Sequence, residues 1–347
     1  MNDTRERKRS HIEICTNRDV RFRKSTLLEE VELIHCALPE CDLEDVSLAT
    51  TFLDRPLGAP FFIGAMTGGT GDGGAFNMTL AEGAARYNIG MCLGSIRPAL
   101  LDSSCIPEFQ VKQVSKDLLV FANIGANQLN SFSPDQILDL SAELADGLMV
   151  HLNAGMELIQ PGGDVRFSGQ IDAIARLVER ASGHPIIVKE TGMGLSLRDG
   201  VRLKRAGVTA VETAGAGGTS WVGVETERAT GINRAVGKVL WDFGIPTAAS
   251  IHWMNELGFE TIGSGGVYNA LDAARAIRLG AQAVAMARPF LLAYEQERRH
   301  GVEQLIEELV VGLKYVMLCV GAVDMAQLKN VPCIVGNKLQ RFFEIDS

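Results

Sequence analysis

The stretch that decides the fold is "QIDAIARLVERASGHPIIVK", residues 170–189. Its first part places apolar side chains at helical spacing and stops at Gly183, which is typical of an amphipathic helix that ends at a glycine. A short apolar, β-branched run, Ile186–Lys189, comes almost directly afterwards. The stretch therefore predicts a helix followed by a buried β-strand.

The same alternation runs through most of the chain. The apolar runs are Phe61–Ile63, Ile89–Leu93, Leu118–Ala122, Leu148–His151, Ile186–Lys189, Ala210–Thr213, Glu260–Gly263 and Ala283–Ala287. Helical signals lie between them, such as "SPDQILDLSAEL" (133–144), in which Ser133 and Gln136 form a capping box around Pro134 at the first helical position. Eight β–α units in series favour an α/β fold, the (β/α)₈ TIM barrel.

A doubly wound open sheet is the alternative fold. It would place G-x-G-x-x-G after the first strand, and "GAMTGGTGDGG" (64–74) does not fit that spacing cleanly. Outside the repeating units, residues 1–55 are expected to be an N-terminal extension contributing to the substrate site. Residues 56–347 are expected to be the barrel, with a C-terminal amphipathic helix over 302–320.

Composition narrows the class of protein. The 347 residues are 46% hydrophobic and 22% charged, with a net charge of −9, which gives no basic footprint for nucleic acid. The start "MNDTRERKRSHIE" has no apolar core typical of a signal peptide, and no stretch of about 18 apolar residues predicts a membrane span. Seven cysteines without a C-x-x-C pair indicate reduced thiols and a cytoplasmic location, and the six scattered histidines argue against structural zinc.

Chemistry in such barrels sits where the strands end. The strand-end segments are "GAMTGG" (64–69), "GSIR" (94–97), "NIGANQ" (123–128), "HLNAGME" (151–157), "KETGMG" (189–194), "TAGAGGTSW" (213–221), "GSGGVY" (263–268) and "MARP" (286–289). Two glycine-rich turns in the later half favour a phosphate site, since backbone N–H groups can approach the anion there; the alternative is that glycine only makes tight turns.

Several charged residues admit two interpretations. Lys189 ends a very apolar strand, so it is either a cation beside a cofactor or a lysine that reaches solvent or pairs with Glu190. Glu157 and Asp164 could hold a hard cation, although loop carboxylates are usually solvated. His151 is a binding candidate or a satisfied core residue. The basic run "RERKRSHIE" (5–13) is a binding segment or, on spacing alone, a solvated tail.

Taken together, these segments resemble the type 2, FMN-dependent isopentenyl diphosphate isomerases over nearly the whole chain. The matching motifs are Arg7-Lys8-x-x-His11, "AMTGG" (65–69), "GSIR" (94–97), Asn123, "HLN" (151–153), Glu157, "QP-G-D" (160–164), "KE-G-G" (189–194), "GAGGTSW" (215–221), "GIPTAAS" (244–250), "SGG" (264–266) and "LGAQAVAMARPFL" (279–291). Each motif alone is weak, but their order and spacing are specific.

The resemblance implies roles for individual residues. FMN would be bound by Ala65, Met66, Thr67, Ser95, Asn123, Lys189, Thr219, Gly265, Gly266, Val267, Ala287 and Arg288. The substrate diphosphate would be bound by Arg7, Lys8, His11, Arg97, His151 and Asn153. Of these, His151 and Asn153 would also be catalytic, and Glu157 would hold Mg²⁺. Reduced FMN, with NAD(P)H as its reductant, would move a double bond by adding one proton and removing another, without net redox chemistry. Homotetramers or homo-octamers are implied too.

Four positions depart from the family pattern. Met156 replaces the Gln of His-Leu-Asn-x-x-Gln-Glu, a doubtful catalytic position here because Met offers no donor. Gly162 stands where the family has Glu, Glu212 stands where it has Asp, and Tyr268 stands where it has Arg. The resemblance therefore implies either an isomerase with tolerated changes or a paralogue whose reduced FMN isomerises or cyclises a different prenyl compound.

Two other classes of protein remain as alternatives. A 2-hydroxy acid oxidase would share the barrel and the glycine turns, but "SIHWMNE" (250–256) lacks its His-Gly-x-Arg base. The other class is a flavin-binding protein without catalytic activity.

Overall fold

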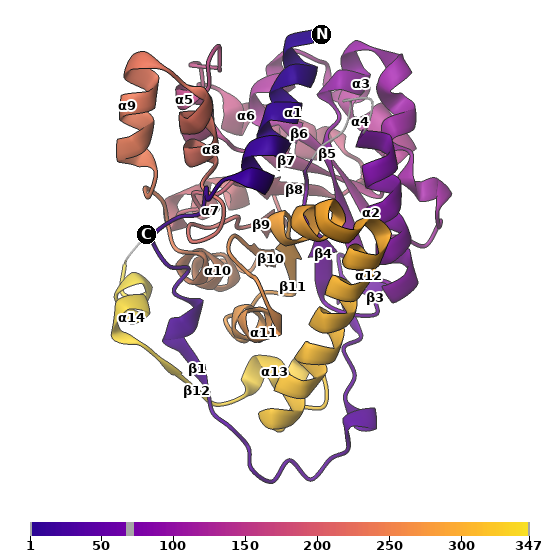
Figure 1. The fold of residues 1–347 in the computed structure, drawn as a ribbon, viewed down its shortest axis with the longest axis vertical. Coiled ribbons are helices and arrows are strands. Elements are labelled where there is room, and N and C mark those ends of the chain that lie inside the picture. The colour runs from indigo at the N-terminus through magenta and orange to yellow at the C-terminus, as the bar shows by residue number, and fades with distance from the viewer. Residues whose placement is uncertain (1, 67–72, 346–347) are drawn as a thin grey trace.

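Eight parallel strands form a closed barrel in the computed structural model, which describes residues 2–66 and 73–345 (Figure 1). The strands are β4 (Phe61–Ile63), β5 (Gly90–Ser95), β6 (Val120–Gly125), β7 (Gly147–His151), β8 (Ile186–Lys189), β9 (Ala210–Glu212), β10 (Glu260–Ser264) and β11 (Ala283–Met286). The barrel closes where β11 pairs with β4, with Val284 opposite Phe61 and Met286 opposite Ile63. The predicted TIM barrel is confirmed, and the open-sheet alternative is wrong.

Helices surround the barrel and alternate with the strands. The larger ones are α2 (Gly73–Tyr87), α4 (Pro134–Leu144), α6 (Gln170–Arg180), α7 (Leu197–Arg205), α10 (Thr247–Glu256), α11 (Ala270–Arg278) and α12 (Arg288–Cys319). Shorter helices α3 (Arg97–Leu101), α5 (Ala154–Ile159) and α8 (Trp221–Arg228), together with α9 (Gly231–Leu240), lie in the loops that follow the strands. Helix α4 begins with the predicted capping box of Ser133 and Gln136.

The C-terminal helix differs from the sequence-based expectation in its boundary. Helical structure predicted for 302–320 begins at Arg288, and the backbone leaves helical geometry only at Glu297 and Arg298. Polar and charged residues occupy 295–300, so they hid the apolar spacing of the first segment of α12. Two further helices follow, α13 (Met325–Asn330) and α14 (Asn337–Phe343).

One end of the barrel is plugged with apolar side chains. The hairpin of β2 (Thr50–Phe52) and β3 (Arg55–Leu57) delivers Phe52, whose ring lies 5.4 Å from that of Phe62 and 5.9 Å from that of Phe121. These aromatic pairs and the fully buried side chains around them exclude water from the interior. Only the other end, where the strands terminate, is left for a site. The boundary drawn between residues 55 and 56 falls inside β3.

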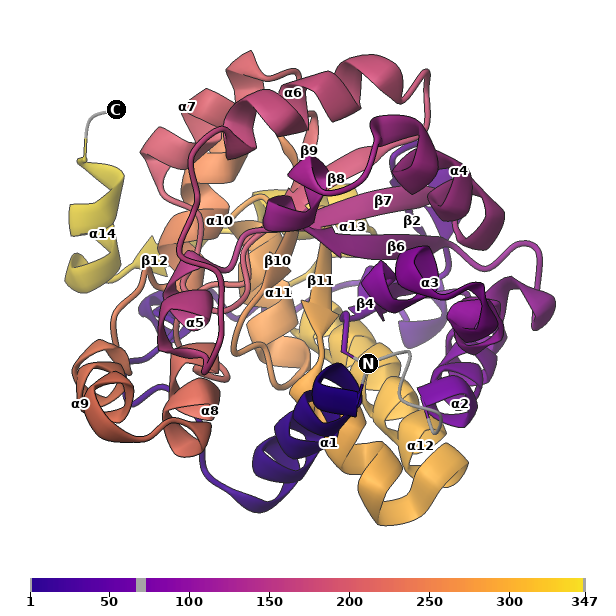
Figure 2. The ribbon, with the colours of Figure 1, turned by 90° about the horizontal axis from the view of Figure 1, so that it is seen from above.

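Two strands near the ends of the chain pair outside the barrel. Strand β1 (Val31–Leu33) pairs antiparallel with β12 (Cys333–Val335). Helix α1 (Asn2–Asn17) lies across the open end of the barrel and contacts α8 and α12 (Figure 2). The basic run is thus part of a packed helix and not a solvated tail.

Candidate active site

A single pocket at the open end gathers the predicted site residues of the described chain. Its lining includes Arg7, Lys8, His11, Ala65, Met66, Ser95, Arg97, Asn123, His151, Asn153, Met156, Glu157, Lys189, Thr219, Gly265, Gly266, Val267, Ala287 and Arg288. Thr67 lies outside the described residues. Residues separated by most of the chain therefore face one cavity, because every barrel strand ends at the same side.

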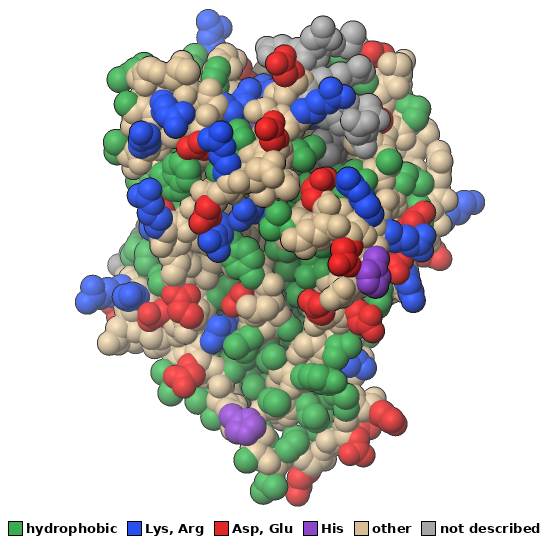
Figure 3. All heavy atoms as spheres, viewed as in Figure 1, with side chains coloured by type: hydrophobic (Ala, Val, Ile, Leu, Met, Phe, Trp, Pro, Cys, Tyr) green, Lys and Arg blue, Asp and Glu red, His purple; other side chains and the backbone are tan. Residues whose placement is uncertain are grey.

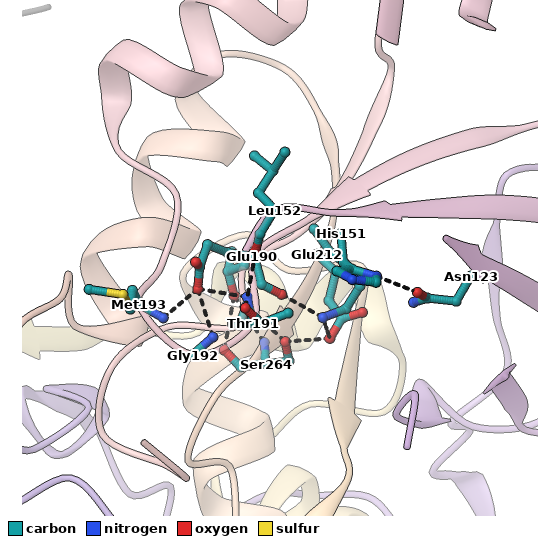
Figure 4. Close-up of polar contacts among 12 residues, drawn as sticks. Asn123, His151, Leu152, Glu190, Thr191, Gly192, Met193, Glu212 and Ser264 are labelled. Carbon is teal, nitrogen blue, oxygen red and sulfur yellow. Dashed lines mark hydrogen bonds and ion pairs between the residues drawn. The ribbon is translucent and has the colours of Figure 1, made fainter. Parts of the chain in front are cut away.

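The floor of the pocket is a row of polar side chains on successive strands (Figure 4). On β6 and β7, the Oδ1 atom of Asn123 lies 2.6 Å from Nδ1 of His151. Since a carbonyl oxygen only accepts, His151 donates from Nδ1, which leaves Nε2 with its lone pair in the neutral ring. Burial, then the charges of Lys189 and Lys8, lower the pKa of His151 to about 3. His151 is therefore neutral near pH 7.

Lys189 at the end of β8 is enclosed by the protein and does not reach solvent. It is 7% exposed, its ammonium donates to the carbonyl of Glu190 at 2.5 Å, and it lies 3.6 Å from Oε1 of Glu212 on β9. The alternative of a solvent-seeking lysine is wrong. A buried ammonium with one backbone bond has donors left for whatever fills the pocket.

The carboxylate of Glu190 is turned away from Lys189. Its Oε2 accepts the backbone N–H groups of Thr191 at 2.6 Å, Gly192 at 2.7 Å and Met193 (Figure 4). Burial raises the pKa of Glu190 to about 7, against the three N–H donors that favour its charged form. Glu190 thus shapes the loop after β8, and the alternative in which its side chain pairs with Lys189 is wrong.

The two glycine-rich turns pack against each other at the rim. A Cβ built on Gly218 would lie 2.3 Å from the backbone N of Gly266, and Gly265 and Gly266 adopt φ values of 98° and 73°. Only glycine permits both this approach and these backbone angles. Backbone without side chains therefore lines this part of the pocket, a surface that an anionic phosphate can approach closely.

The guanidinium of Arg288 is hydrogen-bonded to backbone carbonyls, unlike that of a typical phosphate-binding arginine. Its guanidinium donates to the carbonyls of Cys15 at 2.9 Å and Arg18 at 3.1 Å, near the end of α1. A cation there complements the unpaired carbonyls of a helix terminus. The remaining guanidinium N–H groups and the backbone N–H of Arg288 at the start of α12 are left for a phosphate.

Helix α1 brings cations over the pocket. Burial, followed by the neighbouring charge of Arg7, lowers the pKa of Lys8 to about 8. The Nε2 atom of His11 lies 2.7 Å from Oε1 of Glu225 on α8, a fully buried carboxylate that also binds Arg228 at 2.5 Å. Burial lowers the pKa of His11, although Glu225 opposes the shift. The His11–Glu225 contact fixes α1 against the barrel rim.

Glu157 on α5 is held by three donors. Its carboxylate accepts from Asn153 Nδ2 at 2.8 Å, Gln160 Nε2 at 3.1 Å and the backbone N–H of Asp164 at 2.8 Å. Within residues 2–66 and 73–345 no group of three or more His, Cys, Asp or Glu could hold a metal ion. Any cation at Glu157 must therefore take most of its ligands from water or substrate oxygens, as Mg²⁺ commonly does.

Sequence reasoning missed several lining residues. Gln128, Gln160, Thr191, Trp221 and Ser264 also face the pocket. All five lie inside segments already quoted from the sequence: "NIGANQ" (123–128), "QP-G-D" (160–164), "KETGMG" (189–194), "GAGGTSW" (215–221) and "SGG" (264–266). Membership in these segments was the available signal, but which of their side chains face the pocket depends on tertiary packing.

The departures from the family pattern fall at different places. Met156 and Glu212 line the pocket, and Tyr268 stands at its rim, 40% exposed. Gly162 adopts a φ of 70° with open space where a Cβ would be. A glycine relaxes the backbone there and removes the family's carboxylate from the loop after Glu157.

The architecture is shared with flavoenzymes. The barrel superposes on the flavin-binding domain of baker's yeast flavocytochrome b2 with a TM-score of 0.66 and 20% identity, covering 88% of this chain and 76% of that one. A mandelate oxidase gives a TM-score of 0.63 at 15% identity, with 90% of each chain covered. The FMN-dependent dehydrogenase family matches residues 151–334. These matches define the class as an FMN-dependent dehydrogenase-type barrel.

Closer relatives define the family within that class. The isopentenyl-diphosphate delta-isomerase of Nostoc sp. is 40% identical over 333 residues, covering 94% of this chain and 95% of its own length. That of Methanosarcina barkeri is 36% identical over 342 residues, covering 96% and 93%. The chain belongs to the isopentenyl-diphosphate delta-isomerase family.

Proposed function

We propose that this protein is an FMN-dependent isomerase that interconverts isopentenyl and dimethylallyl diphosphate. The observation that carries the proposal is one pocket with two separate groups of residues that suit anions. The packed glycine turns with the start of α12 form the first, and the cations of α1 form the second. A phosphate-bearing cofactor and a diphosphate substrate need two such regions. An overall negative chain can bind both because these sites are local.

FMN suits the first region. Gly218, Gly265 and Gly266 leave room for its phosphate against backbone N–H groups, and Ala287 and Arg288 add the start of α12. Lys189 supplies a buried cation on the floor, and Ser95, Asn123 and Thr219 supply hydrogen-bonding groups. Ala65, Met66 and Val267 give apolar contact. Reduced FMN would supply the acid/base group that adds one proton to the substrate and removes another.

The diphosphate suits the second region. Arg7, Lys8 and Arg97 would pair with its oxygens, and Asn153 would donate through its amide. Neutral His151 would offer only the lone pair of Nε2, which cannot donate to an anion. His151 would therefore have to be protonated at Nε2 to bind the diphosphate, and the negative charge of the diphosphate would favour that protonation. His11 would act mainly by fixing α1, because its Nε2 already binds Glu225.

Three further components belong to the proposal. Mg²⁺ would bridge Glu157 and the diphosphate, NAD(P)H would reduce the flavin, and the chain would act in the cytoplasm as a homotetramer or homo-octamer. In the described chain no helix is long and apolar enough to cross a membrane. On the face shown in Figure 3, Lys and Arg side chains are interspersed with Asp and Glu. Such a mixed surface favours small anionic ligands bound in a pocket over an extended polyanion.

An oxidoreductase of 2-hydroxy acids is not favoured by the site. His252, the only histidine of "SIHWMNE", lies on α10, and its ring stacks 3.6 Å from that of Phe343 on α14. It is absent from the described pocket lining. A base in that position could not reach a substrate at the barrel mouth, whereas proton transfer by the cofactor needs no such residue.

Met156 supports a second candidate, a paralogue acting on a different prenyl compound. The side chain lines the pocket beside Asn153 and Glu157, where an apolar, adaptable group would pack against hydrocarbon. The shared motifs and the relatives favour the isomerase. Separating the candidates requires prenyl diphosphates of increasing length, each supplied with reduced FMN and Mg²⁺, and identification of the products.

Cofactor binding is tested first. The purified protein should be yellow, or should change the absorption spectrum of added FMN. Activity should appear only when the bound flavin is reduced under anaerobic conditions. A colourless protein that leaves the FMN spectrum unchanged would contradict the proposal.

A further inference from the structure

Three neighbouring strands place Lys189, Glu212 and Ser264 side by side on the pocket floor. In the β8–β9 register, Lys189 lies directly opposite Glu212, and Ser264 ends the next strand, β10. All three side chains are buried, and all three line the pocket. The layer beneath them consists of apolar residues such as Ile187, Ala210 and Ile262. The charges of this row are therefore set by one another and by whatever occupies the pocket above.

Glu212 is poorly compensated by hydrogen bonds. The side chain is 4% exposed, and its Oε1 accepts from the Ser264 hydroxyl at 2.8 Å. Its Oε2 is buried and finds no hydrogen-bond partner among the described residues. A buried carboxylate in this state depends on a nearby positive charge. Lys189, 3.6 Å away, supplies it.

The dependence is mutual. The adjacent carboxylate, that of Glu190, accepts three backbone N–H groups of its own loop and forms no ion pair with Lys189 in the described chain. Glu212 is thus the carboxylate that balances the Lys189 ammonium. Without it, Lys189 would present a full positive charge to the cofactor across a poorly solvated layer, where charges act strongly.

We propose that Glu212 is a positioning residue for Lys189. Its carboxylate holds the Lys189 ammonium on the pocket floor and offsets the positive charge. Reduced FMN is therefore bound more weakly, relative to oxidised FMN, than it would be beside Lys189 alone. The inference rests on the proposed function, since it requires FMN beside Lys189. Reduction makes the flavin more electron-rich and more negative, so an unbalanced cation stabilises the reduced form. The Lys189–Glu212 pair keeps the reduced flavin a better proton acceptor than lysine alone would.

The decisive variant is Glu212→Gln, which keeps the size of the side chain and an oxygen for Ser264 but removes the charge. Dissociation constants of oxidised and reduced FMN, together with the midpoint potential of the bound flavin, should be measured anaerobically. We expect the preference for reduced FMN to rise about tenfold, which is about 30 mV more positive for a two-electron couple. Ser264→Ala, which removes a hydrogen bond but no charge, is the matched control and should shift the potential less.

A pair of Lys189 variants covers the case in which Glu212→Gln does not fold. Lys189→Gln should lower the potential, and the double variant Lys189→Gln with Glu212→Gln should raise it again by about the same tenfold preference. Equal potentials in wild type and Glu212→Gln would overturn the inference alone. Where Glu212→Gln does not fold, equal potentials in Lys189→Gln and the double variant would overturn it. Failure of the wild-type protein to bind FMN would instead overturn the proposed function.

Discussion

The two halves of the pocket are built in different ways. The cofactor half consists of strand ends and glycine turns of the barrel, in which Lys189, Glu212 and Ser264 are almost completely buried. The substrate half depends on α1, a helix from the far end of the chain. Side chains such as His11, bound to Glu225, and Arg288, bound to α1 carbonyls, fix that helix.

This difference separates two tasks. Hydrogen bonding within the sheet and close glycine packing determine the cofactor half, so a change there disturbs the barrel itself. The substrate half can vary in α1 and in the Met156 loop while the barrel stays intact. A change of substrate is therefore expected to arise in the second half, and the two halves should respond differently to mutation.

The largest effect should come from Lys189→Ala. The change removes the cation from the cofactor half and leaves Glu212 as an unpaired buried carboxylate, which typically costs roughly 3–5 kcal/mol. FMN affinity, followed by fluorescence titration, should fall by two orders of magnitude or more, and the free energy of unfolding should fall too. Lys112→Ala is the matched control, because Lys112 pairs with Asp146 at 2.8 Å outside the pocket. If Lys189→Ala binds FMN as tightly as the wild type does, Lys189 does not contribute to the cofactor site.

Deleting residues 1–9 should affect only the substrate half. The deletion removes Arg7 and Lys8 from the lining, and a hydrogen bond to a charged group contributes roughly 1.5–3 kcal/mol. We expect KM for a prenyl diphosphate to rise tenfold to a hundredfold, with FMN affinity unchanged. Arg9→Ala is the control, since Arg9 lies on the same helix but is exposed. A normal KM after the deletion would show that α1 does not bind the diphosphate.

Met156→Gln sharpens the comparison within the substrate half. In an isomerase, the amide restores a donor and an acceptor beside Glu157, and turnover of isopentenyl diphosphate should rise. In a paralogue, an unpaired amide costs roughly 1–3 kcal/mol where hydrocarbon packs, so the native reaction should slow about tenfold. Met156→Leu, which keeps an apolar side chain, is the control. Equal rates for all three proteins would show that this position contacts no substrate.

The smallest effect concerns pH. The pKa of folded His151, about 3, lies below its ordinary value of about 6.5, so between these values only the unfolded chain takes up the proton. Stability should therefore fall as pH decreases from about 6.5, by at most about 1.4 kcal/mol per pH unit from this group. Urea unfolding at pH 7 and pH 5.5 should show a smaller loss in His151→Asn than in the wild type. The exposed His300→Asn serves as control. The same loss in His151→Asn and wild type would contradict the low pKa.

Local sequence patterns were enough to predict the barrel. Runs such as Ile186–Lys189 and Phe61–Ile63 match β8 and β4 residue for residue, because a buried parallel strand is an uninterrupted apolar segment. The pairing of β1 with β12 and the plug formed by Phe52 were not predicted. The first joins strands about 300 residues apart and the second brings Phe52 against Phe121, and no local periodicity encodes such contacts.

The sequence was enough to predict which residues belong to the site, but it did not predict the direction of individual side chains. Strand-end position, together with the family pattern, indicated residues that line one pocket. The sequence did not reveal that Arg288 points to α1 or that Glu190 turns to its own loop. These outcomes depend on which unpaired backbone groups lie nearby after folding, and that is a property of the tertiary structure.

One measurement tests the central claim most directly: incubation of the wild-type protein with isopentenyl diphosphate, Mg²⁺ and FMN reduced under anaerobic conditions, followed by identification of the product. The account predicts dimethylallyl diphosphate, no net oxidation of the flavin, and no conversion with oxidised FMN. Flavin that binds and is reduced, without any dimethylallyl diphosphate, would contradict the assignment as an isomerase of isopentenyl diphosphate.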